Sequence, residues 1–126
     1  MKLLWIGAGG ALGSVARYLL DGWVQRWTAS GFPFGILVVN VLGSFALGLV
    51  MTLLEARGAL DSTLRLTLTA GVLGGFTTYS SFNYQTLELL RARDWTSAGL
   101  NLAATVVLCL VAGLLGLGAG RWLAGG

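Results

Sequence analysis

Apolar residues fill four long stretches of the chain, and short polar segments separate them. The stretches run over residues 3–20, 34–54, 66–90 and 98–123. Each is near the ~20 residues that an α-helix needs to cross the hydrocarbon core of a bilayer. The pattern therefore predicts an all-α membrane protein in which residues 1–126 form one unit of four transmembrane helices.

The third stretch differs from the others because its centre is polar. Residues 71–82 read Gly-Val-Leu-Gly-Gly-Phe-Thr-Thr-Tyr-Ser-Ser-Phe. Glycine weakens a helix, and short hydroxylated side chains compete for its backbone hydrogen bonds. Lipid offers no replacement, so such a run is stable only where it is buried in protein or lines a wet cavity. We therefore expect the third helix to be broken mid-membrane, at a functional site.

Local sequence features place the ends of the predicted helices. Pro33 fits the first turn of the second helix, and Asp61 with Ser62 supplies an N-cap for the third. Tryptophans occur near the predicted ends, as an aromatic belt requires, at Trp23, Trp27, Trp95 and Trp122. Lys2 and the apolar run after it faintly resemble a signal peptide, but Arg17 interrupts that run and three further apolar stretches follow. We therefore expect a first membrane span.

Pairs of glycines four residues apart give three helices a small face on which another helix can pack closely. The pairs are Gly9/Gly13, Gly71/Gly75 and Gly116/Gly120. The first also suggests a dinucleotide-binding loop, but the third glycine of that fingerprint is replaced by Leu12 and no βαβ pattern follows. Packing is the favoured interpretation of all three pairs.

The composition excludes several classes of function. Hydrophobic residues make up 56% of the chain and charged residues 10%, which is too apolar for an ordinary soluble domain. There is no histidine and one cysteine, Cys109, so the sequence excludes an internal disulfide, a Cys/His metal site and a His-based triad. The sequence has no long basic run, so we do not expect it to bind nucleic acid. We expect a protein that is not an enzyme.

Several polar side chains fall within the apolar stretches, and most have two interpretations. Arg17 either faces a partner or wet vestibule or extends to the membrane surface. Asn40 either forms an interhelical hydrogen bond or presents its amide donors to a pathway. Asn101, Thr105 and Cys109 recur every four residues, and for this stripe packing is favoured.

Charged residues give little preference for one orientation. With four spans, Lys2, Arg57, Arg65 and Arg121 would share one side, and Arg26, Arg91 and Arg93 the other, joined by Arg17 if it extends that way. Because Lys and Arg are nearly equal in number on the two sides, the chain could insert in both orientations. Two oppositely inserted copies could then pair about a two-fold axis. The carboxylates occur at or near the predicted span ends, at Asp21, Glu55, Asp61, Glu88 and Asp94. Buried donors without buried acids suit a small, strongly hydrated anion.

The chain resembles the small bacterial fluoride channels of the Fluc or CrcB family over nearly its whole length. The likeness begins with Gly9-Gly10 through Gly13 and Arg17-Tyr18, and continues with Gly35 and Asn40-Val41-Leu42-Gly43-Ser44-Phe45. Most specific is the run over residues 71–82, which is similar to the family's Gly-Gly-x-Thr-Thr-Phe-Ser-Thr-Phe signature. The resemblance implies an antiparallel, dual-topology homodimer in the bacterial inner membrane. Such a dimer would pass fluoride passively out of the cytoplasm and so reduce its toxicity.

The resemblance also implies a site. The family's structural sodium ion, at the dimer interface, would be held here by the backbone carbonyls of Gly74 and Thr77. Its paired phenylalanines fall at Tyr79 and Phe82, whose ring edges carry partial positive charge. Fluoride would lose its water to donors and ring edges along a pathway formed by Asn40, Thr78, Tyr79, Ser80, Ser81 and Phe82.

The chain departs from the family pattern at five positions. Tyr79 stands where the family usually has Phe, Ile36 where many members have Thr, and Gln85 where many have Glu. Cys109 and Gly113 stand where Ser and Thr are expected. Two other classes of function remain open: a small dual-topology exporter of organic cations, which predicts a central membrane carboxylate, and a non-transporting assembly subunit, which predicts no ion flux.

Overall fold

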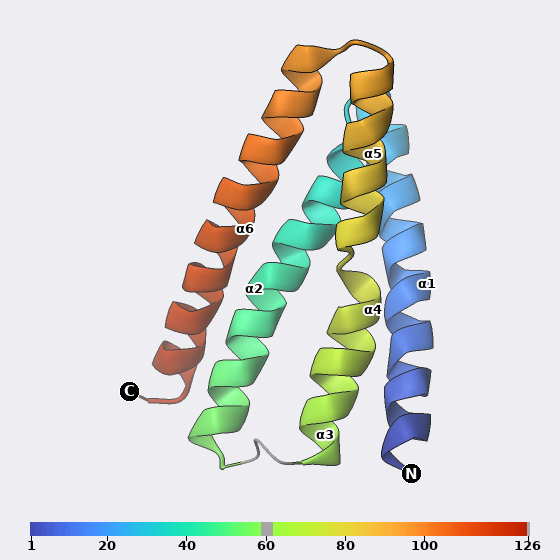
Figure 1. The fold of residues 1–126 in the computed structure, drawn as a ribbon. Helices are drawn as coiled ribbons and strands as arrows, with labels where there is room; N and C mark the ends of the chain where they lie inside the picture. The colour runs from blue at the N-terminus through green and yellow to red at the C-terminus, as the bar shows by residue number, and fades with distance from the viewer. Residues whose placement is uncertain (59–61, 126) are drawn as a thin grey trace.

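The computed structural model describes residues 1–58 and 62–125, and in these ranges the chain is helical with short connections (Figure 1). No strand occurs in either range, which confirms the all-α prediction there. In chain order the helices are α1 (Lys2–Thr28), α2 (Phe34–Ala56), α3 (Thr63–Leu66), the π-helical segment η1 (Thr67–Leu73), α4 (Gly74–Phe76), α5 (Tyr79–Arg91) and α6 (Trp95–Leu123).

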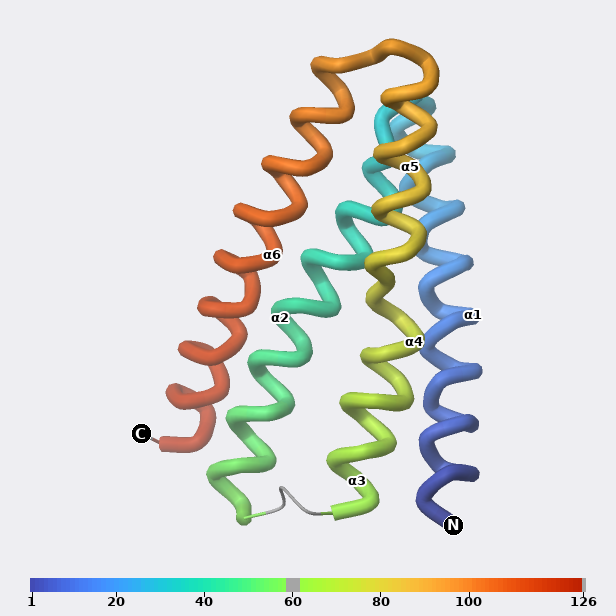
Figure 2. The backbone as a smooth tube through the Cα atoms, in the orientation of Figure 1, coloured from blue at the N-terminus to red at the C-terminus, as the bar shows by residue number. Residues whose placement is uncertain are grey.

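Three of these helices, α1, α2 and α6, are long and apolar enough to cross a membrane. The remaining apolar stretch is divided. α3, η1 and α4 follow one another without a gap, and α5 continues after a short break. In Figures 1 and 2 the pieces lie nearly end to end, with α3, η1 and α4 between α1 and α2 and with α5 continuing toward the top of the view.

The helix ends lie within three residues of the predicted span ends, with one exception. Ser62 accepts a hydrogen bond from the Arg65 N–H at the start of α3, as an N-cap does, whereas Asp61 lies outside the described residues. Pro33 is the N-cap residue of α2. The first helix, however, continues past residue 20 to Thr28 and ends at Ala29, whose φ of 45° is left-handed. No proline interrupts this segment, so the helix persists into the polar region.

Glycines set the contact between α1 and the broken segment, which confirms the packing interpretation. A Cβ atom built on Gly9 would meet the Thr67 carbonyl oxygen at 2.8 Å. One built on Gly75 would meet the Gly10 carbonyl at 2.5 Å, and one on Gly71 the Ile6 carbonyl at 3.0 Å. Real Cβ atoms do not approach backbone atoms as closely as those on Gly9 and Gly75 would, so glycine at these two positions allows the helices this separation.

Glycines also allow α6 to pack closely against α2. A Cβ on Gly116 would collide with the carbonyl of Phe45, and one on Gly120 would lie 2.6 Å from the Thr52 Cβ. From the other side, a Cβ on Gly48 would lie 2.6 Å from the Gly113 carbonyl. These contacts make the α2–α6 interface close along the lower half of both helices.

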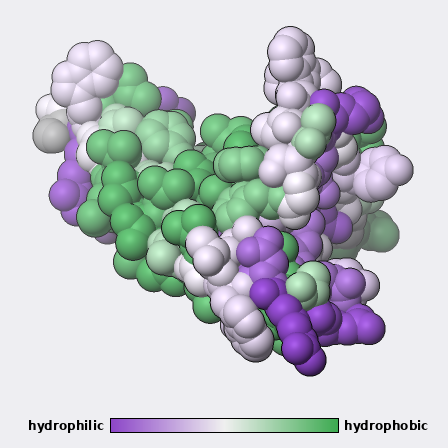
Figure 3. Space-filling view, turned by 90° about the horizontal axis from the view of Figure 1, so that it is seen from above, coloured by the Kyte–Doolittle hydropathy of each residue, from purple (hydrophilic) through white to green (hydrophobic). Residues whose placement is uncertain are grey.

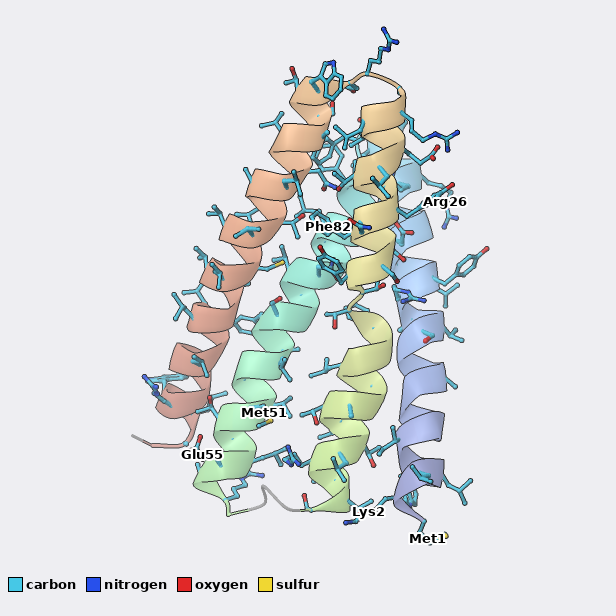
Figure 4. All side chains as sticks on the ribbon, in the orientation of Figure 1. Met1, Lys2, Arg26, Met51, Glu55 and Phe82 are labelled. Atoms are coloured by element: carbon cyan, nitrogen blue, oxygen red, sulfur yellow. The ribbon has the colours of Figure 1, made fainter. Side chains whose placement is uncertain are left out.

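The outer surface suits a bilayer. Figure 3, a view from above, shows hydrophobic side chains over the middle and left of that face and most of the hydrophilic ones toward its right side. Trp95 begins α6, Trp122 lies near its end, and Trp23 and Trp27 pair near the end of α1 with ring centroids 5.9 Å apart. All four are exposed, as an aromatic belt requires. In Figure 4, Lys2 and Glu55 lie at one end of the bundle and Arg26 at the other.

Candidate functional site

The break predicted within the third apolar stretch lies at Thr77 and Thr78. α4 ends at Phe76, both threonines adopt extended backbone conformations (ψ 146° and 122°), and α5 begins at Tyr79. In Figure 2 the tube straightens between α4 and α5. Glycines and hydroxyls favour a break here because they weaken the helix and offer the backbone other partners. The interruption leaves several backbone groups without their usual helical partners.

Asn40 of α2 binds both backbone groups of Thr78. The Thr78 N–H donates to Asn40 Oδ1 at 2.9 Å, and Asn40 Nδ2 donates to the Thr78 carbonyl at 3.2 Å. Asn40 is buried, with 7% of its surface exposed. Because buried backbone groups must be hydrogen-bonded, this side chain stabilises the break. The sequence left open an interhelical hydrogen bond or a place on a pathway, and the structure has the hydrogen bond.

Two carbonyls at the break lose their ordinary helical donors as a result. In a continuous helix the Gly74 carbonyl would accept from the Thr78 N–H, which here donates to Asn40. The Thr77 carbonyl would accept from the Ser81 N–H, which here donates to Thr78 Oγ1 at 3.3 Å. These are the two carbonyls predicted to hold a cation. Oxygen ligands of this kind suit a hard cation.

The hydroxyl of Thr78 organises the start of α5. Besides capping α5 through the Ser81 N–H, its Oγ1 lies 3.1 Å from Ser80 Oγ and 3.5 Å from Ser81 Oγ. Ser80 is exposed and Ser81 half-buried. The four consecutive residues 78–81 therefore present hydroxyl groups from a single turn.

A groove of about 510 Å³ opens beside the break, between α2, α5 and α6. None of the residues that line it carries a charge. They are Asn40, Gly43, Ser44, Leu47, Thr77, Thr78, Tyr79, Phe82, Thr105, Val106, Cys109 and Leu110. The groove brings together four of the six residues predicted for a pathway, and Ser80 and Ser81 are not part of its lining.

Two aromatic rings stand at this groove. The ring centroids of Tyr79 and Phe82 lie 5.7 Å apart at an interplanar angle of 58°, a tilted arrangement. Phe82 is buried, and Figure 4 shows it between α5 and α2. Tyr79 is 76% exposed. The Phe82 ring is therefore held by the residues packed around it, whereas the Tyr79 ring is exposed at the open side of the groove.

The polar stripe on α6 divides between two environments. Asn101 is buried and donates to Thr86 Oγ1 of α5 at 2.9 Å, as the packing interpretation expects. Thr105 and Cys109 instead line the groove. Within residues 1–58 and 62–125, Thr105 Oγ1 is buried without a hydrogen-bond partner. Sequence reasoning did not single out Thr86, whose only sequence signal is its place one turn after Phe82.

Arg17 lies outside the groove lining. It is half-buried in the body of α1, one turn before Asp21, with which it interacts electrostatically. Asp21 was expected near a span end, but α1 continues beyond it for about two turns. A Cβ built on Gly35 would collide with Asp21 Oδ1, so this carboxylate packs against the start of α2.

The positions that depart from the fluoride-channel pattern lie in different surroundings. Ile36 is buried, and Gln85 lies with Gln25 and Glu88 at a small pocket of about 200 Å³. Gly113 lies beside Cys109 along a second, more apolar groove of about 450 Å³ between α2 and α6. Of these positions, only Tyr79 and Cys109 line the groove beside the break.

Comparison with known proteins gives one consistent result. The family described as "CrcB-like protein, Camphor Resistance (CrcB)" matches residues 4–117. A protein of Sorangium cellulosum (strain So ce56) named "Fluoride-specific ion channel FluC" is 48% identical over 125 residues, 99% of this chain and 98% of the relative. Proteins of the same name from Anaeromyxobacter sp. (strain K) and Opitutus terrae are 52% and 53% identical, over 98% and 90% of this chain and 98% and 87% of the relatives.

Proposed function

Because the chain belongs to the CrcB family, we propose that it is a fluoride-selective channel that lets fluoride leave the cytoplasm passively. It is a multi-pass protein of the bacterial cell membrane. The observation that carries the proposal is the groove at the helix break. Its lining combines amide and hydroxyl groups with two aromatic rings, and none of the described residues that line it is charged.

The chemistry of this lining fits a small anion. Fluoride holds its hydration water tightly, so a pathway must replace that water with donors. Ser44, Thr78 and Thr105 line the groove, and the Thr105 Oγ1, which has no hydrogen-bond partner among the described residues, can donate. The edges of Tyr79 and Phe82 add partial positive charge without an ion to trap the anion. Ser80 and Ser81 orient the Thr78 hydroxyl and supply donors at the same turn.

In the proposed channel, α3, η1, α4 and α5 together form the third of the four membrane spans in chain order. Non-helical backbone at membrane depth is tolerated where protein or a wet cavity surrounds it. Here the break contacts protein through the hydrogen bonds from Asn40, and the groove is the cavity beside it. We place Arg17, half-buried in α1, at the vestibule rather than at the constriction.

The active form we propose is an antiparallel homodimer with a structural sodium ion at its interface. The groove is open on one side and the exposed Tyr79 ring lies on it, so a second copy would complete its wall. The nearly balanced Lys and Arg distribution permits opposite insertion. Gly74 and Thr77 would hold the ion with the two carbonyls that lack helical donors, and the ion would stabilise the break.

Fluoride efflux from liposomes that contain the purified protein, with sodium present and chloride efflux as the comparison, tests the proposal. We expect fast fluoride efflux and little chloride efflux. Phe82→Ile, which replaces the ring by an aliphatic side chain, should lower fluoride efflux. No efflux from a folded wild-type dimer would refute the channel proposal and favour an assembly subunit. Cation-coupled efflux of organic dyes would favour an exporter.

A further inference from the structure

A buried hydrogen-bond chain connects α6 to the residue that carries the inner aromatic ring. Asn101 Nδ2 donates to Thr86 Oγ1 at 2.9 Å, and Thr86 Oγ1 donates to the Phe82 carbonyl at 2.9 Å. The three residues are 2%, 5% and 6% exposed. The single Thr86 hydroxyl therefore accepts from α6 and donates within α5.

The Thr86 hydroxyl differs from an ordinary back-bonded hydroxyl, because it also accepts a hydrogen bond from another helix. A Thr hydroxyl often back-bonds to the carbonyl four residues earlier, and Thr52 does so with Gly48 in α2 at 2.8 Å. Thr52 has no counterpart of Asn101 in its hydrogen bonds within the described ranges. At Thr86 the second hydrogen bond fixes the hydroxyl, and with it the Phe82 carbonyl, relative to α6.

The position of α5 depends on such links. α5 starts directly after the extended residues Thr77 and Thr78, so no continuous helix holds it to α4. It packs mainly against α6. Asn40 fixes Thr78 at the start of α5, and Asn101 fixes Thr86 two turns later. Phe82 lies midway between these two fixed points.

We infer that Asn101 and Thr86 are positioning residues that hold the Phe82 ring at the constriction of the groove. The inference rests on the proposed channel function and assigns a role to two residues outside the groove lining. An aromatic ring can contribute to selectivity only if it stays in one place, and buried chains of hydrogen bonds restrict motion of this kind. Loss of the chain should therefore change conduction through Phe82 without unfolding the protein.

Thr86→Val tests this, because valine keeps the shape and removes both hydrogen bonds. We expect fluoride efflux to fall roughly tenfold, the change expected when a buried hydrogen bond that orients an interacting group is lost. Thr86→Ser keeps the hydroxyl and should conduct like the wild type. Asn101→Leu should resemble Thr86→Val, and it decides the matter if that variant does not fold. Thr52→Val, which removes a similar back-bond on α2, is the matched control and should conduct normally.

Coupling to Phe82 separates positioning from general packing. Phe82→Ile should lower efflux much less in the Thr86→Val background than in the wild type, and by the full factor in the Thr52→Val background. A 4-fluorophenylalanine label at position 82 should give one sharp ¹⁹F resonance in the wild type and Thr86→Ser, and a broadened or split one in Thr86→Val. If the wild type conducts fluoride and Thr86→Val conducts equally, the inference alone fails. If the wild type does not conduct, the proposed function fails and takes the inference with it.

Discussion

The hydrogen bonds between Asn40 and Thr78 give the sharpest prediction, because they connect the groove to the proposed cation site. Asn40→Ala removes the partner of both the Thr78 N–H and the Thr78 carbonyl. A buried group left without a partner costs ~1–3 kcal/mol, so the two together cost ~2–6 kcal/mol if the break keeps its shape.

The chain has one way to reduce that cost. The freed Thr78 N–H can turn back to the Gly74 carbonyl, its partner in a continuous helix. This restores one hydrogen bond and leaves ~1–3 kcal/mol of destabilisation from the Thr78 carbonyl. It also occupies one of the two carbonyls proposed to hold sodium. The variant should therefore be less stable and respond less to sodium.

Thermal unfolding of the purified protein, in sodium and in a choline buffer without sodium, measures both effects. A ligand that binds only the folded state at 100 times its Kd stabilises it by about 2.7 kcal/mol. The wild type should melt higher in sodium, and Asn40→Ala should melt lower than the wild type in both buffers with a smaller sodium shift. Equal melting and an equal sodium shift in the variant would refute the role of Asn40 at the break. An absent shift in the wild type would refute the sodium proposal alone.

Asn40→Asp separates the hydrogen bonds from the charge. The carboxylate still accepts from the Thr78 N–H, so the Gly74 carbonyl stays free and the sodium shift should persist. It cannot donate to the Thr78 carbonyl, and it places a negative charge beside the groove, so fluoride efflux should be lost. Unchanged fluoride efflux in this variant would exclude Asn40 from the neighbourhood of the permeating ion.

Three further variants test the groove and the glycine packing. Thr105→Val removes a buried hydroxyl without a partner, so it should leave stability unchanged or raise it by ~1 kcal/mol while lowering fluoride efflux; a loss of stability would contradict the first expectation. A charged methanethiosulfonate reagent should block efflux by modifying Cys109 and have no effect on Cys109→Ser, whereas efflux that survives complete labelling would exclude this part of the groove. Gly13→Ala should destabilise the protein by ~1–3 kcal/mol because its Cβ collides with backbone at Val72, and Gly7→Ala, with nothing within 4 Å, is its control in thermal unfolding.

The features that the sequence predicted well are those with local or periodic causes. Glycines beside hydroxylated residues weaken a helix wherever they occur, so the break could be placed within the run 71–82. Glycines four apart share a helix face, so the close approach of Gly9 and Gly75 to neighbouring backbone followed from spacing alone. The cap at Ser62 is likewise a local pattern.

The features that could not be predicted depend on the register between distant segments. The chain separates Asn40 from Thr78 by 38 residues, and no local pattern indicates that one amide side chain pairs with both backbone groups of the other. The bond from Asn101 to Thr86 depends in the same way on how α6 lies against α5. The run 77–82 also gave no means of separating the residues that line the groove from Ser80 and Ser81, because that depends on the exact residue at which α5 begins.

The break also supports the proposal that a single copy of the chain is an incomplete unit. In hydrocarbon, each exposed backbone group without a partner costs several kcal/mol, so a membrane helix is interrupted only where other groups meet its needs. Asn40 and Thr78 satisfy part of that need within one chain, through the Thr78 backbone and the Ser81 N–H. One chain does not supply the usual helical donors of two carbonyls, those of Gly74 and Thr77. It also leaves the Tyr79 ring exposed and one side of the groove open. In the proposed dimer, a cation would bind these carbonyls and a second copy of the chain would cover the groove. The two would depend on each other, because a cation between two copies is bound by carbonyls from both. We therefore expect sodium removal and dimer dissociation to occur as one event rather than two.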